Sequence, residues 1–97
     1  MESFRTKAFR KLYNELPDFV RQKAQSNYKK WIQNPYNSEI KFENIYKNFW
    51  SASIGYSYRA IGKMVENNII VWFGIGTHED YNQIIKQLKN LAKGKIN

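Results

Sequence analysis

Apolar residues recur at helical spacing in the first third of the chain. The first group lies three or four residues apart and comprises Phe9, Leu12, Tyr13 and Leu16. The second group has the same spacing and comprises Val20, Ala24, Tyr28, Trp31 and Ile32. Leu16-Pro17 separates the two groups, with Pro17 suited to the first turn of a new helix, and Asn34-Pro35 ends the second. The pattern predicts a short helix followed by a longer one, which together form a helical hairpin.

From Ile40 onward the apolar period becomes two, as in strands. In residues 49–54 the apolar positions alternate with Ser51 and Ser53, and short polar turns at 55–57 and 66–68 separate this run from 58–65 and 69–75. Three consecutive strands with short turns predict an antiparallel meander. Residues 4–9 are expected to form a short strand or a lead-in to the first helix.

A further helix is predicted after Gly76. Thr77 followed three residues later by Asp80 resembles a capping box, and Glu79 and Asp80 suit the positive end of the helix dipole. Its apolar stripe comprises Tyr81, Ile84, Ile85, Leu88 and Leu91. The predicted class is α+β: two helices packed on a twisted sheet, with a C-terminal helix, in a single domain over residues 1–97.

Charge suggests what kind of molecule binds this fold. Sixteen Lys and Arg against eight Asp and Glu give a net charge of +8, which favours a polyanionic partner, either nucleic acid or an acidic protein. The chain has no cysteine, which suits the reducing cytoplasm, and its single histidine argues against a zinc site. The apolar run 69–75 is much shorter than the roughly 20 residues that span a bilayer, and no signal peptide begins at Met1. We therefore expect a cytoplasmic protein with no membrane contact.

His78, the only histidine, is expected just past the last central strand, in the first turn of a helix. Backbone N–H groups there favour anions such as phosphate, and a histidine can act as general acid or base. The alternative is an ordinary surface histidine in a turn.

Arg59 is either an exposed strand residue or a guanidinium that binds phosphate, and Tyr81 is expected to pack in the core by default. Lys29 and Lys30 belong either to a solvated helix face or to an RNA contact.

Two stretches of the second half resemble the RelE/ParE superfamily of bacterial type II toxins. They are F-W-S-A-S-I-G-Y-S-Y-R-A-I-G from residue 49 and I-I-V-W-F-G-I-G-T-H-E-D-Y-N-Q-I-I from residue 69. The Leu-Pro and Asn-Pro pairs of the helical hairpin fit the same pattern. The resemblance implies a microbial RNase-like fold, in which a helical hairpin packs on a twisted antiparallel sheet and a cleft lies on the open face.

The resemblance also implies an activity. Many family members are ribosome-dependent mRNA endoribonucleases, or mRNA interferases, that need no metal or other cofactor. A base takes the 2′-hydroxyl proton, the oxygen attacks phosphorus, an acid protonates the leaving 5′-oxygen, and cations stabilise the added charge. Arg59 would match the phosphate-stabilising arginine, His78 the acid or base of the histidine-containing branch, of the YafQ type, and Tyr81 the terminal aromatic. The expected partners are the ribosome, mRNA and a cognate antitoxin.

The chain departs from the RelE branch at the strand before Arg59. That branch places lysines there, whereas this chain has Ser51 and Ser53, so Lys41 or Lys47 is expected to contact RNA instead. The strand arginine also occurs in the ParE branch, whose members poison DNA gyrase and cut no RNA. A gyrase-binding toxin and a degenerate, non-toxic member therefore remain alternative interpretations.

Overall fold

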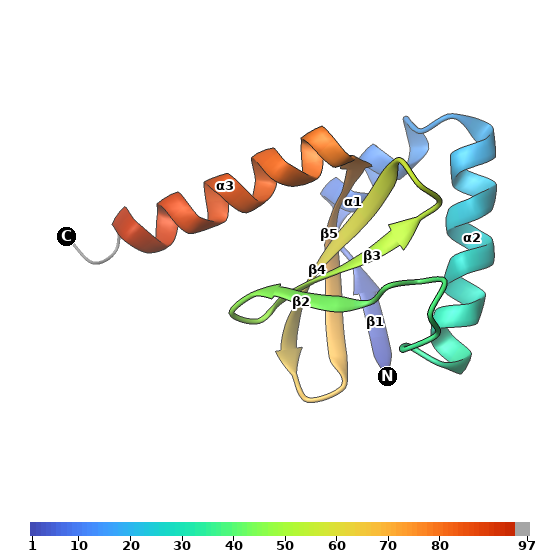
Figure 1. Ribbon diagram of the computed structural model, residues 1–97, viewed down its shortest axis with the longest axis horizontal. Coiled ribbons are helices and arrows are strands. Elements are labelled where there is room, and N and C mark those ends of the chain that lie inside the picture. Colours follow the sequence, from blue (N-terminus) through green and yellow to red (C-terminus); the bar gives the residue numbers. More distant parts are fainter. Residues whose placement is uncertain (95–97) are drawn as a thin grey trace.

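The computed structural model describes residues 1–94, which form a five-stranded sheet and three helices. In chain order the elements are β1 (Glu2–Arg5), α1 (Lys7–Asn14), α2 (Asp18–Gln33), β2 (Glu43–Tyr46), β3 (Phe49–Ile54), β4 (Tyr58–Glu66), β5 (Ile69–Thr77) and α3 (His78–Gly94). The strands lie in the order β1-β5-β4-β3-β2 across the sheet (Figure 1).

The predicted α+β class and the meander of β3, β4 and β5 are confirmed. β3 has the predicted bounds, β4 ends one residue later than predicted, and β5 continues to Thr77. The register pairs Ser53 with Arg59 across β3 and β4, and Arg59 with Gly76 across β4 and β5. Because paired residues project on the same face of a sheet, Ser53 and Arg59 share one face.

The two outer strands differ from the prediction. β1 covers Glu2–Arg5 and runs parallel to β5, so the sheet is not wholly antiparallel. Residues 4–9 were expected to form a short strand or a lead-in to the first helix. The strand ends at Arg5 and α1 begins at Lys7, because the Thr6 hydroxyl accepts from the Phe9 N–H at 3.0 Å and so caps α1. β2 was not predicted as a strand; it pairs antiparallel with β3 at the other edge.

The helical hairpin of α1 and α2 buries the core against one face of the sheet. Trp31 of α2 is 2% exposed, and its ring makes edge-to-face contacts with Trp72 of β5 and with Phe42, each at 5.6 Å between centroids. Trp50 stacks on Phe42 at 4.6 Å. Trp31 and Trp72 thus belong to the buried core, and the half-buried Trp50 packs against it.

α3 begins on the other face of the sheet and then runs away from it, on the side opposite α2 (Figure 1). The predicted capping box forms: the Thr77 N–H donates to Asp80 Oδ2 at 3.0 Å, and the Asp80 N–H donates to Thr77 Oγ1 at 3.2 Å. A Cβ at Gly76 would lie 2.6 Å from Asp80 Oδ2, so the absence of a side chain there lets the capping residue approach β5. These contacts fix the first turn of α3, which carries two of the predicted site residues.

Candidate active site on the open face of the sheet

The Arg59 guanidinium is held by three oxygen-bearing side chains from neighbouring strands. Its Nη2 donates to Ser51 Oγ at 2.7 Å and to Glu43 Oε1 at 3.1 Å, and its Nη1 donates to Ser53 Oγ at 3.4 Å. Only 11% of the Arg59 side chain is exposed. Such a fork of donors in a fixed orientation matches the geometry of a phosphate or carboxylate.

Tyr81 covers this guanidinium from the first turn of α3. The Arg59 Cζ lies 5.0 Å from the centroid of the Tyr81 ring, within cation–π range. The ring is half-buried, so it belongs neither to the closed core nor to the open surface. Tyr81, on the apolar stripe of α3, therefore packs on Arg59 and not in the core, where it was expected by default.

His78 is exposed, yet its ring is oriented by a hydrogen bond. Its Nε2 lies 2.8 Å from the backbone carbonyl oxygen of Tyr56, in the turn between β3 and β4. Because a carbonyl oxygen only accepts, Nε2 carries the hydrogen and Nδ1 is the nitrogen left to exchange a proton. The His78 backbone N–H also donates to the Ser57 carbonyl oxygen, at 3.2 Å. Two bonds to one turn thus fix this residue.

The strand register brings Arg59 and His78 to the same corner of the sheet. Arg59 pairs with Gly76, and the preceding residue, Tyr58, pairs with Thr77, immediately before His78. Directly paired antiparallel residues lie about 4.5–5.5 Å apart at Cα. The guanidinium, the tyrosine ring and the imidazole therefore come from the same corner of the sheet, where β5 continues into α3.

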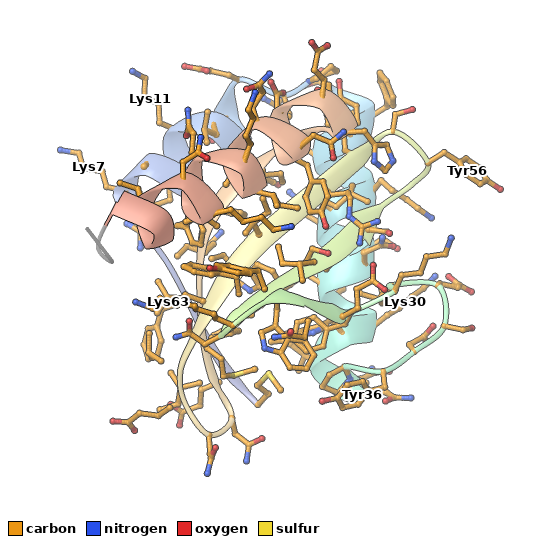
Figure 2. All side chains as sticks on the ribbon, turned by 60° about the vertical axis from the view of Figure 1, so that its left-hand side comes forward. Lys7, Lys11, Lys30, Tyr36, Tyr56 and Lys63 are labelled. Carbon is orange, nitrogen blue, oxygen red and sulfur yellow. The ribbon has the colours of Figure 1, made fainter. Side chains whose placement is uncertain are left out.

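The four predicted RNA-binding lysines are scattered. Lys47 lies in the turn before β3, with its ammonium 5.5 Å from the centroid of the Tyr46 ring, and Lys41 is exposed just before β2. Lys29 and Lys30 lie on α2, against the face opposite Arg59 (Figure 2 labels Lys30). The Lys30 ammonium is 2.6 Å from Glu39 Oε2, and this hydrogen bond and charge lower the pKa of Glu39. The structure does not bring the α2 lysines to the site.

The sequence interpretation missed Glu43 and two lysines of the open face. Lys63 of β4 lies 5.9 Å from the Phe49 ring centroid, and Lys89 of α3 lies 5.9 Å from the Tyr46 ring centroid. Lys63 follows Arg59 by four residues, on the same strand face, and projects below α3 in Figure 2. The alternation in β4 contained the signal for Lys63, whereas Glu43 and Lys89 depend on contacts across strands and from α3.

A cavity of about 340 Å³ lies on the other face of the sheet, between the helical hairpin and the strands. Phe9, Trp31, Ala52 and Trp72 are among its lining residues, which include neither Arg59 nor His78 nor Tyr81. The candidate site therefore lies on the charged open face and not in this hollow.

Within residues 1–94 no three His, Cys, Asp or Glu side chains gather as a potential metal site. No helix in this part of the chain combines the length and apolar character needed to cross a bilayer.

A known protein family accounts for this arrangement. The model of the ParE-like toxin domain matches residues 18–83, which is more than half of the chain and includes Arg59 and His78. The chain therefore belongs to the ParE-like toxin family, within the RelE/ParE superfamily of toxins. No curated protein sequence matches it significantly.

Solved structures of toxins share the fold at low sequence identity. The RelB–RelE antitoxin–toxin complex from Methanococcus jannaschii matches with a TM-score of 0.66 and 15% identity, over 84% of this chain and 96% of that one. The YoeB/ParE toxin from Agrobacterium tumefaciens has a TM-score of 0.62 and 14% identity, over 80% and 99%. The intact E. coli RelBE toxin–antitoxin complex has a TM-score of 0.58 and 13% identity, over 78% and 94%. These matches confirm the predicted RelE-like fold.

Proposed function

We propose that this toxin inhibits translation by cutting mRNA on the ribosome, as an endoribonuclease that uses its own side chains as acid, base and cation. The observation that carries the proposal is the preorganised guanidinium of Arg59. Two serines, a carboxylate and the Tyr81 ring hold it at the corner of the sheet that also carries the oriented His78. Hydrogen-bond donors that are fixed in advance where charge develops in the transition state make the largest single contribution to the rate acceleration in many enzymes.

The roles follow from the chemistry of each group. Arg59 stabilises the extra negative charge on the phosphorane-like transition state. His78 exchanges a proton through Nδ1, because Nε2 is occupied by the Tyr56 carbonyl oxygen. Glu43 is the carboxylate in contact with Arg59, and its side chain is 61% exposed, so substrate can reach it. We assign the 2′-hydroxyl proton to the Glu43 carboxylate and the protonation of the leaving 5′-oxygen to His78.

The open face also offers a route for the rest of the RNA. Lys47, Lys63 and Lys89 each place an ammonium over an aromatic ring of this face. Cations interleaved with aromatic rings are typical of surfaces that bind single-stranded nucleic acid. Lys41 stands just ahead of Glu43 and is a further phosphate contact, whereas Lys29 and Lys30 would contact RNA only from the opposite face.

A cognate antitoxin is the second partner that we infer. The similar structures from M. jannaschii and E. coli are toxin–antitoxin complexes. With a net charge of +8, this chain would attract an acidic antitoxin, since complementary charge speeds association and selects partners. An antitoxin that covers the open face would block Arg59 and His78 together.

Primer-extension mapping of mRNA in a ribosome-containing translation reaction tests the proposal. We expect the wild type to cut, His78→Gln to cut about 10²–10⁴-fold more slowly, and Arg59→Ala about 10²–10³-fold more slowly. Gln retains a donor for the Tyr56 carbonyl oxygen but cannot exchange a proton at neutral pH. Arg10→Ala, which removes an exposed arginine from α1, is the matched control and should cut normally.

Two results would redirect the interpretation. Intact mRNA at every codon with the folded wild type would refute the nuclease. Gyrase-dependent DNA breaks in cells that express the wild type would then select the gyrase-binding alternative. Cleavage that survives His78→Gln would retain the nuclease but remove the acid role of His78.

A further inference from the structure

Tyr56 is the most exposed large apolar or aromatic side chain of the part of the chain that the structure describes. It is 98% exposed, against 73% for Phe19 and 65% for Tyr36. A tyrosine ring that is almost wholly in water contributes no packing to the fold. Single exposed aromatics are common on protein surfaces, so exposure alone assigns no role to Tyr56.

The position of Tyr56 is what sets it apart. It is the middle residue of the turn 55–57, which follows the last β3–β4 pair, Ile54 with Tyr58. Its own carbonyl oxygen is the partner of His78 Nε2, at 2.8 Å. A carbonyl oxygen lies about 2.4 Å from the Cα of its residue, so the Tyr56 Cα is within roughly 5 Å of the imidazole. The backbone that carries this aromatic ring is thus anchored next to the group that we assign to proton transfer.

The turn that carries the ring is held in place. Gly55 has a φ of +62°, in the left-handed region where glycine carries no Cβ penalty. The Ser57 carbonyl oxygen accepts from the His78 N–H at 3.2 Å, so two consecutive carbonyls of the turn bond to one residue. The ring therefore projects from a fixed base, at the edge of the molecule in Figure 2.

We propose that Tyr56 stacks on a nucleobase next to the scissile phosphate and thereby sets the position of the cut. The inference rests on the proposed ribonuclease function and adds to it a residue that selects the register of the RNA. Every base offers a face to an aromatic ring, so stacking holds single strands with little sequence preference. A base on Tyr56 would bring its adjoining phosphate toward His78 and Arg59.

The test compares cleavage rates over a range of mRNA–ribosome complex concentrations for wild type, Tyr56→Phe, Tyr56→Ala and the control Tyr36→Ala. All three variants retain the backbone carbonyl that orients His78, and the exposed Tyr36 lies apart from Tyr56, below it in Figure 2. We expect Tyr56→Phe to match wild type. Tyr56→Ala should raise KM about 5- to 150-fold, with kcat changed less than about threefold. Tyr36→Ala should have no effect.

Wild-type KM in Tyr56→Ala, or a fall in kcat at constant KM, would overturn the stacking role. If the wild type itself cuts no mRNA, the ribonuclease proposal fails, and binding of a fluorescent single-stranded RNA oligonucleotide then tests Tyr56 separately. Weaker binding by Tyr56→Ala but not by Tyr36→Ala would support the stacking role, and equal binding by both would refute it.

Discussion

The guanidinium carbon of Arg59 lies 5.0 Å from the centroid of the Tyr81 ring. This contact joins the middle of the sheet to the first turn of α3. Neither residue could hold this position alone. The capping box of Thr77 and Asp80 fixes the turn that presents the ring, and Ser51 and Ser53 fix the guanidinium beneath it. The site is therefore assembled at the junction of two elements and depends on both.

Substitutions at Tyr81 separate the ring from its hydroxyl. Tyr81→Phe keeps the cation–π contact, so we expect the stability and the cleavage rate to stay near wild type. Tyr81→Leu keeps bulk but loses the π face, which should lower the free energy of unfolding by about 0.5–2 kcal/mol and slow cleavage. Urea unfolding and mRNA cleavage measure the two effects. An inactive but stable Tyr81→Phe would show instead that the hydroxyl takes part in the chemistry.

Glu43→Gln tests the base that we assign. Gln still accepts from Arg59, and because the Glu43 side chain is 61% exposed, loss of the ion pair should change the free energy of unfolding by less than about 1 kcal/mol. Cleavage should fall by at least about 100-fold, while RNA binding should not weaken, since a negative charge near the phosphate is removed. Single-turnover cleavage and anisotropy titration measure these quantities. Full activity in Glu43→Gln would assign the base elsewhere.

Gly76→Ala should disturb the start of α3. The new Cβ would lie 2.6 Å from Asp80 Oδ2 and 2.8 Å from Asp80 Cβ, so either the capping side chain or the helix must move. We expect a loss of roughly 1–3 kcal/mol in the free energy of unfolding, and slower cleavage because His78 and Tyr81 move with the helix. Asp80→Gly, which removes every Asp80 atom that the new Cβ would meet, alone measures the loss of the cap. If the clash is with this side chain, the double variant loses less stability than the sum of the two; strict additivity would contradict the structure.

The ion pair of Lys30 and Glu39 predicts a pH dependence of stability. Lys30 lowers the pKa of Glu39 in the folded protein, so the pair stabilises the fold above the ordinary glutamate pKa. This contribution is lost as the pH falls below the ordinary glutamate pKa and through the lowered pKa of Glu39. Urea unfolding of wild type and Lys30→Ala should therefore differ more at about pH 7 than at about pH 3. An equal difference at both values would show that the pair does not form in solution.

Elements defined by local periodicity could be predicted from the sequence. The helical hairpin, the meander from Phe49 and the capping box of Thr77 each depend on residues a few positions apart, and each is confirmed. The strand β1 was only partly predicted, because its partner β5 lies more than 60 residues later and no local pattern gives that pairing. β2 has four residues of mixed polarity, and only its pairing with β3 defines it.

The candidate site was predictable in its members but not in its contacts. Arg59, His78 and Tyr81 stood out as residue types in a pattern, and their roles remain predictions. The alternation of Ser51 and Ser53 with apolar neighbours placed both serines on one face, yet the hydrogen bonds to Arg59 depend on the register of β3 and β4. Glu43 reaches the site from an edge strand, sixteen residues before Arg59 in the chain.

The central claim is that the 2′-oxygen of the RNA attacks its own phosphate at this site. The most direct measurement uses a message with a single 2′-deoxynucleotide at the position that wild-type protein cuts on the ribosome. We predict that cleavage at that position disappears while binding of the protein to the ribosome complex is unchanged. Cleavage that persists at the deoxynucleotide, or an uncut all-ribonucleotide message, would contradict the proposed chemistry.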